Sequence, residues 1–357
     1  MAQRATLSTV AARAGVSPST ASLAFAGSPR VAPATVERVL RAADELGYAG
    51  PDPVAASLRT GRSGVVGAVV GERLLYAFRD PVAVQLLDGL TEELGTLGVG
   101  LLLLAGDSMR SGPTPAQLAR LPLDAAVFAT CGLEDDPAFR LLQARRVPLV
   151  AVEGPVVPGV PLVGIEDRAG TVTLARHLAE QGHRDVEMVT MPLRLDGRRG
   201  PVDHARLAAG VYRDTRERLL GLRSVFPAAP AVETAANSIE EGERAGLVLL
   251  DRDPRPTAVV AQSDLLAAGV LRAAATLGLG VPGDVSVAGF DGADLPWLEP
   301  VRLTTVVQPT TEKGQAAGRA VAALLSGQLP DDVILPVQLR VGTTTGPAGR
   351  PAARSTT

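Results

Sequence analysis

The segment that most constrains the fold runs from Thr6 to Ser22, TLSTVAARAGVSPSTAS, and predicts two short helices joined by a sharp corner. Apolar residues recur in its first half at spacings of three and four, which gives the first helix one buried face: Leu7, Val10, Ala11 and Ala14. Gly15 can adopt the left-handed conformation that ends a helix. Ser17 is a good N-cap for the second helix, and Pro18 suits its first turn because the N–H that proline lacks would be unpaired there.

A helix, a glycine corner and a capped second helix together describe a helix-turn-helix, whose second helix enters the major groove of DNA. The same pattern also describes a structural helical hairpin, so this segment alone leaves both interpretations open. A third helix follows between Pro33 and Gly47, with an apolar stripe at helical spacing: Val36, Val39, Leu40, Ala43 and Leu46. Three helices of this size bury little apolar surface, so we expect the module to depend on DNA or on a partner for stability.

Charge is distributed unevenly along the chain. Residues 1–62 contain seven arginines and four acidic residues, a net charge of +3, whereas the whole chain carries −3. The remainder therefore carries −6, and DNA attracts only the basic end of such a chain.

After residue 62 the sequence alternates apolar strands with amphipathic helices, in two successive halves of similar construction. The predicted strands cover residues 65–70, 99–105, 125–129 and 149–152 in the first half, and 186–190, 258–261 and 286–290 in the second. Fully apolar strands that alternate with helices predict an α/β fold with parallel, doubly wound sheets. Two such lobes are typical of proteins that hold a ligand between the ends of their strands.

Several classes of protein are disfavoured by the sequence. No apolar run is long enough to cross a membrane, and the helix-turn-helix pattern begins where a signal peptide would stand. The single cysteine, Cys131, leaves no internal disulfide and fits a reducing cytosol. The three histidines lack metal-ligand spacing, and neither a nucleophile elbow nor a phosphate-binding loop occurs. We therefore expect a cytoplasmic protein that is not an enzyme and binds no metal or cofactor.

Motifs along nearly the whole chain resemble one known family. They are the run 6–22 and the segments Glu45–Tyr48, Ser57–Gly61, Ile165–Gly170, His177–Arg184, Pro282–Asp291 and Leu303–Pro309. Together they are similar to the lactose/galactose repressor (LacI/GalR) family of bacterial transcription regulators. The resemblance implies an all-α helix-turn-helix domain followed by a two-lobed α/β core like that of type I periplasmic binding proteins.

The resemblance also implies where the domains begin and end: a DNA-binding domain at residues 1–48, a hinge at 49–62, an effector-binding core at 63–345 and a disordered tail at 346–357. Three crossovers near residues 166, 304 and 331 divide the core. The first lobe then covers about 63–165 and 305–329, and the second about 166–303 and 331–345.

The arginine-rich insertion at residues 192–209 does not fit the family pattern. We interpret it as a flexible surface loop. A lid over the ligand and a second basic contact surface are the alternatives.

In this family the second helix reads the operator, and the matching residues are predicted to contact DNA: Thr6, Ser8, Ser17, Pro18, Ser19, Thr20, Ser22, Leu23, Arg30, Thr35 and Tyr48. Those at phosphate-contacting positions could equally be helix caps or solvated surface groups. Leu58 matches a hinge leucine that wedges into the minor groove, where contacts to the bent DNA offset the cost of unstacking. The alternative for Leu58 is a linker leucine packed on the next domain.

Family receptors hold their ligands with side chains at the inner ends of strands, and the matching residues are Glu153, Arg218, Ser263, Asp264 and Asp291. Carboxylates accept paired hydrogen bonds from vicinal hydroxyls, and an arginine fork donates two, which suits a sugar or related polyol. Three aromatic residues are candidates for stacking on a sugar ring, or else for the core: Tyr76, Phe78 and Trp297. Structural alternatives also exist, since Arg218 could neutralise Glu217 or Asp214, Asp264 could cap a helix and Asp291 could stabilise its turn.

These features together predict a ligand-responsive transcription regulator, most simply a repressor that binds a near-palindromic operator as a homodimer and is switched by a small sugar-like metabolite. A solute-binding receptor of a transporter is one alternative, disfavoured by the first 62 residues. An architectural DNA-binding protein without ligand control is the other, and a ligand effect on DNA binding would distinguish it.

Overall fold

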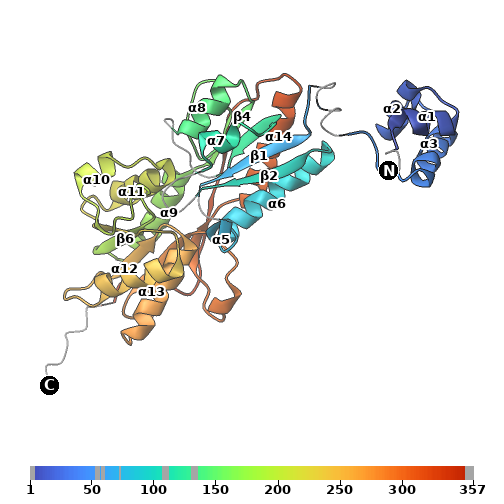
Figure 1. Ribbon diagram of the computed structural model, residues 1–357. Coiled ribbons are helices and arrows are strands. Elements are labelled where there is room, and N and C mark those ends of the chain that lie inside the picture. The colour runs from blue at the N-terminus through green and yellow to red at the C-terminus, as the bar shows by residue number, and fades with distance from the viewer. Residues whose placement is uncertain are drawn as a thin grey trace. The chain divides into compact units, whose positions relative to one another are not determined.

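A computed structural model describes residues 5–52, 57, 61–71, 74–106, 112–129 and 136–349. The chain divides into two compact units, residues 1–64 and 65–357 (Figure 1). No helix in the described part combines the length and the apolar character that crossing a membrane requires.

The described part of the first unit includes helices α1 (Leu7–Ala14), α2 (Pro18–Phe25) and α3 (Pro33–Glu45), as the sequence predicts. Gly15 ends α1 in the left-handed conformation, with φ +65°. The predicted stripe of α3 is wrong at two positions, because Leu40 and Leu46 are 43% and 38% exposed. Small side chains allow the helices to approach closely, so α3 buries alanines instead, and the core of this unit is Val10, Ala11, Ala14, Ala21, Ala24, Val31, Val39, Ala42 and Ala43.

The second unit contains two α/β lobes, which confirms the predicted fold class (Figure 1). The first lobe has a parallel six-stranded sheet in the order β12-β5-β4-β3-β1-β2. Its strands are β1 (Val65–Val70), β2 (Gly100–Ala105), β3 (Ala125–Phe128), β4 (Leu149–Val152), β5 (Leu162–Ile165) and β12 (Val333–Leu335). Its helices are α5 (Leu74–Ala77), α6 (Pro81–Thr96), α7 (Pro115–Leu118), α8 (Pro137–Ala144) and α14 (Thr310–Leu325).

The second lobe has a seven-stranded sheet in the order β13-β11-β10-β9-β6-β8-β7, in which β7 and β13 run antiparallel to their neighbours. Its strands are β6 (Val186–Thr190), β7 (Gly200–Pro201), β8 (Ala231–Glu233), β9 (Ala258–Ala261), β10 (Ser286–Asp291), β11 (Thr304–Val307) and β13 (Gln338–Arg340). Its helices are α9 (Asp167–Glu180), α10 (His204–Ala208), α11 (Arg213–Val225), α12 (Ile239–Leu250), α13 (Asp264–Thr276) and the short 3-10 helix η1 (Pro296–Leu298).

The chain crosses between the lobes three times, but two crossings lie a few residues later than the predicted boundaries. β11 pairs with β10, so the second lobe extends to Val307 and the crossing follows it. β12 pairs with β5 in the first lobe, so the third crossing lies between Leu335 and Gln338. Both boundaries lie later than predicted because β11 and β12 each pair with a strand of the lobe that the chain is about to leave.

Helix α14 returns to the first lobe and packs against α6 through glycines. A Cβ on Gly89 of α6 would lie 2.1 Å from the carbonyl oxygen of Thr311, and a Cβ on Gly314 would lie 2.1 Å from that of Leu86. The two backbones are therefore in direct contact, and no larger residue fits at either position.

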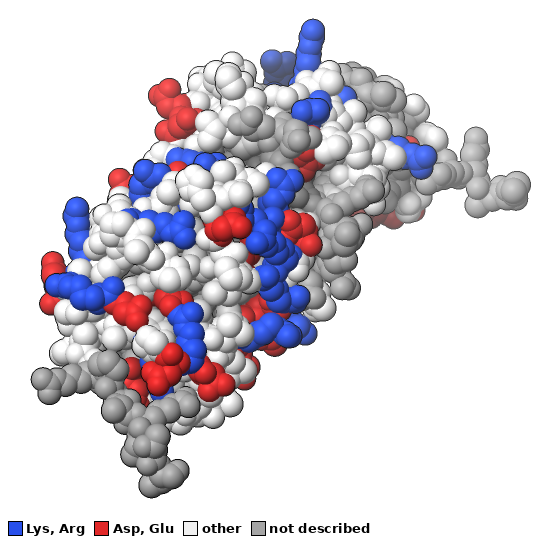
Figure 2. All heavy atoms as spheres, turned by 90° about the vertical axis from the view of Figure 1, so that its left-hand side faces the viewer, with Lys and Arg blue, Asp and Glu red and all other residues white. Residues whose placement is uncertain are grey.

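The insertion at residues 192–209 is not the predicted surface loop. It forms β7, which pairs with β8, and the short helix α10. Leu193, Val202 and Leu207 belong to the core of the second lobe, and this burial fixes the segment. Figure 2 shows both basic and acidic side chains on one face of the molecule. Within the insertion, Arg199 pairs with Glu241, and Arg206 pairs with Asp196 and Glu233, which disfavours a second basic contact surface.

Candidate functional site

The first candidate site is the exposed face of α2 in the first unit. Ser17 begins the helix, and its Oγ accepts a hydrogen bond from the Thr20 N–H at 3.1 Å. Thr6 caps α1 in the same way, by accepting from the Thr9 N–H at 3.3 Å. These hydroxyls hold the helix ends in place, while Leu23 of α2 presents an apolar side chain that is 39% exposed.

The residues predicted to contact DNA differ in their exposure. The exposed ones are Thr6, Ser8, Ser17, Pro18, Ser19, Leu23 and Arg30. The half-buried ones are Thr20, Ser22, Thr35 and Tyr48. Tyr48 packs edge-on against Phe25, with ring centroids 5.7 Å apart, and so ties the end of α3 to α2. Leu58 lies outside the described residues.

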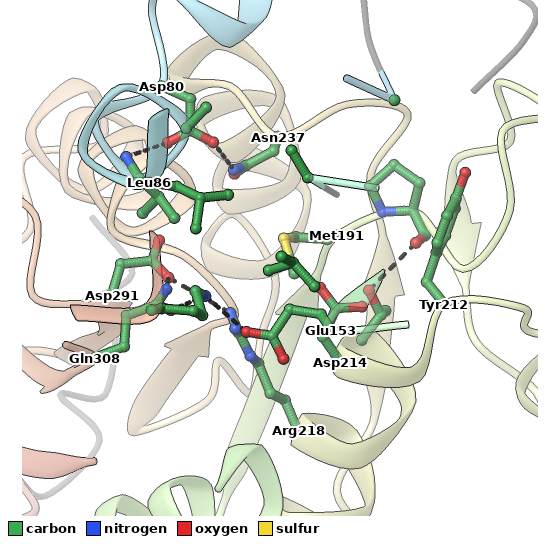
Figure 3. A pocket seen from close by; sticks show the side chains of 18 of the residues that line it. Asp80, Leu86, Glu153, Met191, Tyr212, Asp214, Arg218, Asn237, Asp291 and Gln308 are labelled. Atoms are coloured by element: carbon green, nitrogen blue, oxygen red, sulfur yellow. Dashed lines mark hydrogen bonds and ion pairs between the residues drawn. The ribbon is translucent and has the colours of Figure 1, made fainter. Parts of the chain in front are cut away.

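The second candidate site is a cavity of about 180 Å³ lined by both lobes of the second unit. Glu153 follows β4 of the first lobe, and Asp291 ends β10 of the second. Both have positive φ, +62° and +124°, a conformation that non-glycine residues adopt only when their surroundings hold them there. In Figure 3 the labelled polar side chains of both lobes converge on this cavity.

On the second-lobe side, Arg218 of α11 is 4% exposed and organises the polar groups around it. Its Nε donates to Asp167 Oδ1 at 2.8 Å, its Nη1 donates to the Gln262 carbonyl at 2.6 Å, and Asp291 Oδ1 lies 3.6 Å away. The guanidinium also stacks 3.7 Å from the centroid of the Phe290 ring. Burial opposes the charge of Arg218, but the nearby carboxylates, Asp167 foremost, raise its pKa overall.

On the first-lobe side, Lys313 of α14 connects the two lobes. Its Nζ donates to Glu153 Oε1 at 2.6 Å and to Gln308 Oε1 at 2.7 Å. Gln308, which follows β11, donates in turn to Asp291 Oδ1 at 2.7 Å. Burial raises the pKa of Glu153, against the opposing effect of the Lys313 charge. Burial likewise raises the pKa of Asp291.

A second contact between the lobes lies at the start of α6. Asp80 is the N-cap of this helix and accepts from the Val82 N–H at 2.9 Å. The Asn237 amide of the second lobe donates to the other oxygen of Asp80 at 3.3 Å (Figure 3). Burial raises the pKa of Asp80.

The predicted effector residues do not all line the cavity. Glu153, Arg218 and Asp291 do. Ser263 is instead the N-cap of α13, and it reaches the cavity only through a hydrogen bond to Asn237. Asp264, the first residue of α13, does not match its predicted place, because it is buried against the Thr305 hydroxyl and the Ala293 N–H, at 2.6 and 2.7 Å.

The three aromatic candidates also fall outside the described lining. Phe78 and Trp297 are 56% and 54% exposed and are absent from it. Tyr76 lies in α5, and its side chain is outside the described part of the chain. Stacking on a ring in the cavity is therefore not supported for Phe78 or Trp297.

Seven polar residues line the cavity that were not among the predicted effector-binding residues: Asp80, Tyr212, Asp214, Thr215, Asn237, Gln308 and Lys313. Some signals were present. Asp80 precedes a proline at a helix start, which is an N-cap pattern, and Lys313 is the only lysine of the chain. Tyr212 and Asn237 lie in segments whose position depends on the tertiary fold, and no local pattern marks them.

Two family models match the chain. The model described as bacterial regulatory proteins, lacI family, matches residues 6–50. The model described as periplasmic binding protein-like domain matches residues 175–345.

Proteins that match over nearly the whole chain are named as transcriptional regulators. An HTH-type transcriptional regulator of Mycobacterium tuberculosis is 38% identical over 354 residues, which cover 97% of this chain and 98% of the relative. A solved structure of a LacI-family transcriptional regulator from Corynebacterium glutamicum is 27% identical with a TM-score of 0.72, covering 96% of this chain and 99% of that one. A complex of the transcriptional regulator CelR with cellobiose is 28% identical with a TM-score of 0.67, covering 96% and 100%.

Proposed function

The chain belongs to the lacI family of bacterial regulatory proteins, and we propose that this transcriptional regulator represses its genes by binding a near-palindromic operator as a homodimer in the cytoplasm. A small neutral polyol, most simply a sugar, binds in the cavity and changes the affinity for the operator. The observation that carries the proposal is the buried chain of polar contacts that links the two lobes across this cavity: hydrogen bonds from Lys313 through Gln308 to Asp291, and an ion pair from Asp291 to Arg218.

The first unit supports the DNA-binding part of the proposal. Helix α2 starts with exposed Ser17, Pro18 and Ser19, and small residues there allow close approach to base edges and phosphates. Exposed Leu23 can contact thymine methyl groups in the major groove. A single small module of this kind binds weakly, and two copies related by a two-fold axis would contact adjacent half-sites.

The first lobe supports the homodimer. β2 stands at the end of the strand order of its sheet, and four of its six residues are leucine. Proteins normally cover an apolar sheet edge of this kind. Leu75, Phe78 and Val84, in and around α5 and α6, are 52%, 56% and 43% exposed. Apolar side chains exposed on one lobe in this number are typical of a surface that another chain covers.

The cavity supports the polyol. Carboxylates such as Asp80 and Asp291 accept hydrogen bonds from hydroxyl groups, and the buried guanidinium of Arg218 fixes the Asp291 side of the cavity. The solved complex of CelR, a relative of similar length, contains a disaccharide. A ligand that inserts between Asp80 and Asn237, or near Lys313, contacts both lobes at once, and so binds the closed and open arrangements with different affinity.

Genomic footprinting of the purified protein, with and without a panel of neutral sugars and cyclitols, tests the proposal. We expect protection at a few near-palindromic sites and a change in protection with one class of panel member. Absence of any sequence-selective protection would overturn the repressor function. Selective protection that no metabolite alters would favour an architectural DNA-binding protein instead.

A further inference from the structure

The insertion contributes an apolar part of the cavity lining. Met191, Pro192 and Leu195 line the cavity at the start of the insertion, and all three are apolar. Hydrogen-bonding groups such as Asp291 and Gln308 also line the cavity, as do apolar residues of the first lobe. A ligand in this cavity therefore meets both hydrogen-bonding groups and hydrocarbon.

The segment at residues 191–195 is held by a cluster of ions, of which Arg206 and Glu233 are buried and Asp196 is partly exposed. Arg206 of α10 is 7% exposed. Its Nε and Nη2 donate to the two carboxylate oxygens of Glu233, each at 2.7 Å. Its Nη1 and Nη2 donate to both oxygens of Asp196, at 2.6 and 2.8 Å. One guanidinium thus binds two carboxylates in the fork geometry that gives such pairs their strength and direction.

This cluster fixes Leu195 from both sides along the chain. Asp196, the next residue, is bound directly by Arg206. Leu193, two residues earlier, donates its N–H to Glu233 Oε1 at 2.7 Å, and its side chain is fully buried in the core. The Leu193 backbone on one side of Leu195 and the Asp196 side chain on the other are thus tied to one ion cluster, and we expect Arg206 to influence the position of the Leu195 side chain.

The size and charge of the cavity restrict the ligand further. Its volume of about 180 Å³ is smaller than the roughly 300–1,000 Å³ common for pockets that bind drug-sized ligands. This size favours a ligand with one sugar ring over a ligand with two. Among the described lining residues, four are carboxylic acids, Asp80, Glu153, Asp214 and Asp291, and two are cations, Arg218 and Lys313. A phosphate or carboxylate on the ligand would therefore meet more negative than positive charge.

We propose that residues 191–195 form a specificity wall that selects a single-ring, uncharged polyol, with Leu195 in contact with the carbon face of the ring and Arg206 as the positioning residue. The proposal rests on the proposed function only in taking the cavity as the effector site. It assigns a role to the insertion, which the family pattern does not explain.

Titration calorimetry on the full chain tests Leu195. The panel consists of single rings (myo-inositol, D-glucose, D-galactose and D-ribose), the two-ring sugars cellobiose and maltose, and glucose 6-phosphate. We expect wild-type protein to bind at least one single ring in preference to the two-ring and phosphorylated sugars. Leu195→Ala should lower the affinity for that single-ring sugar about tenfold, because contact with the carbon face of the ring is lost. The ratio of its affinity to the affinity for the two-ring sugars should therefore fall. Leu195→Trp should abolish binding by filling the cavity.

Leu329→Ala is the matched control, since Leu329 is 66% exposed and does not line the cavity. It should leave every affinity unchanged. Unchanged affinity in Leu195→Trp would show that residues 191–195 do not contact the ligand. Preferred binding of the two-ring sugars or of glucose 6-phosphate by wild-type protein would overturn the proposed ligand class.

Arg206 is tested with Arg206→Met and Arg206→Lys, and with Arg319→Met as control, which removes an exposed ion pair with Glu93. Arg206→Met should reduce the preference for single-ring over two-ring sugars, as Leu195→Ala does. Arg206→Lys should retain part of this preference, because an ammonium cannot form the paired hydrogen bonds that the guanidinium makes with both carboxylates. A purely structural role would lower the melting temperature and leave the preference unchanged, which would overturn the positioning role.

Hydrogen exchange separates this proposal from the proposed function. The Leu193 amide should exchange slowly in wild-type protein and Arg319→Met, and at least tenfold faster in both Arg206 variants. If no sugar binds wild-type protein, the sugar effector is wrong, and the exchange rates still decide whether Arg206 holds the wall. Equal exchange rates of the Leu193 amide in all four proteins would show that Arg206 does not hold this segment in place.

Discussion

The Lys313 ammonium lies 2.6 Å from Glu153 Oε1, and both side chains are nearly inaccessible to solvent. Lys313 is the only lysine in a chain whose other basic residues, histidines aside, are all arginine. A compact ammonium fits between Glu153 and Gln308 and donates to both, whereas the planar fork of an arginine needs more room.

Lys313→Met should lower the free energy of unfolding by about 3–5 kcal/mol, because it leaves a buried carboxylate without this cation. Urea denaturation at pH 7 measures the loss. The double variant Lys313→Met, Glu153→Gln should recover much of it, since the buried charge is then removed as well. An equal loss in the single and the double variant would contradict an electrostatic role for the pair.

Asp264 should make stability depend on pH. Burial raises the pKa of this carboxyl from its usual value near 3.8 to about 7 in the folded protein. Between these values the folded state holds a proton that the unfolded state has released, so the free energy of unfolding falls as the pH rises from about 4 to 7 and then levels off.

In urea denaturation from pH 4.5 to 8, the free energy of unfolding should fall less steeply with pH for Asp264→Asn than for wild-type protein. Asp291, Glu153 and Asp80 also have raised pKa values and contribute to the slope of both proteins, so the difference between the two curves is the quantity to measure. Parallel curves would show that Asp264 is ionised throughout.

Arg218→Ala should remove the response to metabolite and leave operator affinity within about twofold of wild type. The guanidinium holds Asp291, a cavity-lining carboxylate, and lies in a different compact unit from α2. Gel retardation with and without the active panel member measures both effects. A retained response would exclude Arg218 from the effector site.

Leu58→Ala should weaken operator binding by about 1–3 kcal/mol, the scale of one base-pair contact, and leave polyol binding intact. The prediction rests on the family motif, because Leu58 lies outside the described residues. Filter binding at a fixed salt concentration measures the change, with Leu329→Ala as the control. Wild-type affinity in Leu58→Ala would favour a linker leucine.

Features set by local sequence were predictable, and features set by tertiary packing were not. The caps at Thr6 and Ser17 and the left-handed Gly15 require only neighbours in the chain, and α1 and α2 follow from them. Glu153 and Asp291 were identified from the family resemblance, which implies ligand-binding side chains at the inner ends of strands, and the structure places Glu153 just after β4 and Asp291 at the end of β10.

The insertion illustrates what the sequence could not reveal. Its arginines and glycines indicate exposure, but Arg206 is buried because Glu233, 27 residues later, places a carboxylate beside it. Asn237 was missed for the same reason, since its partner Asp80 lies 157 residues away. Pairing over such separations leaves no periodic signal in the sequence.

The backbone contact between α6 and α14 has a consequence for how a signal leaves the cavity. With Gly89 and Gly314 in contact with carbonyl groups of the opposite helix, the two helices cannot slide past each other without a clash. We therefore expect a ligand that displaces α14 through Lys313 to move α6 together with it.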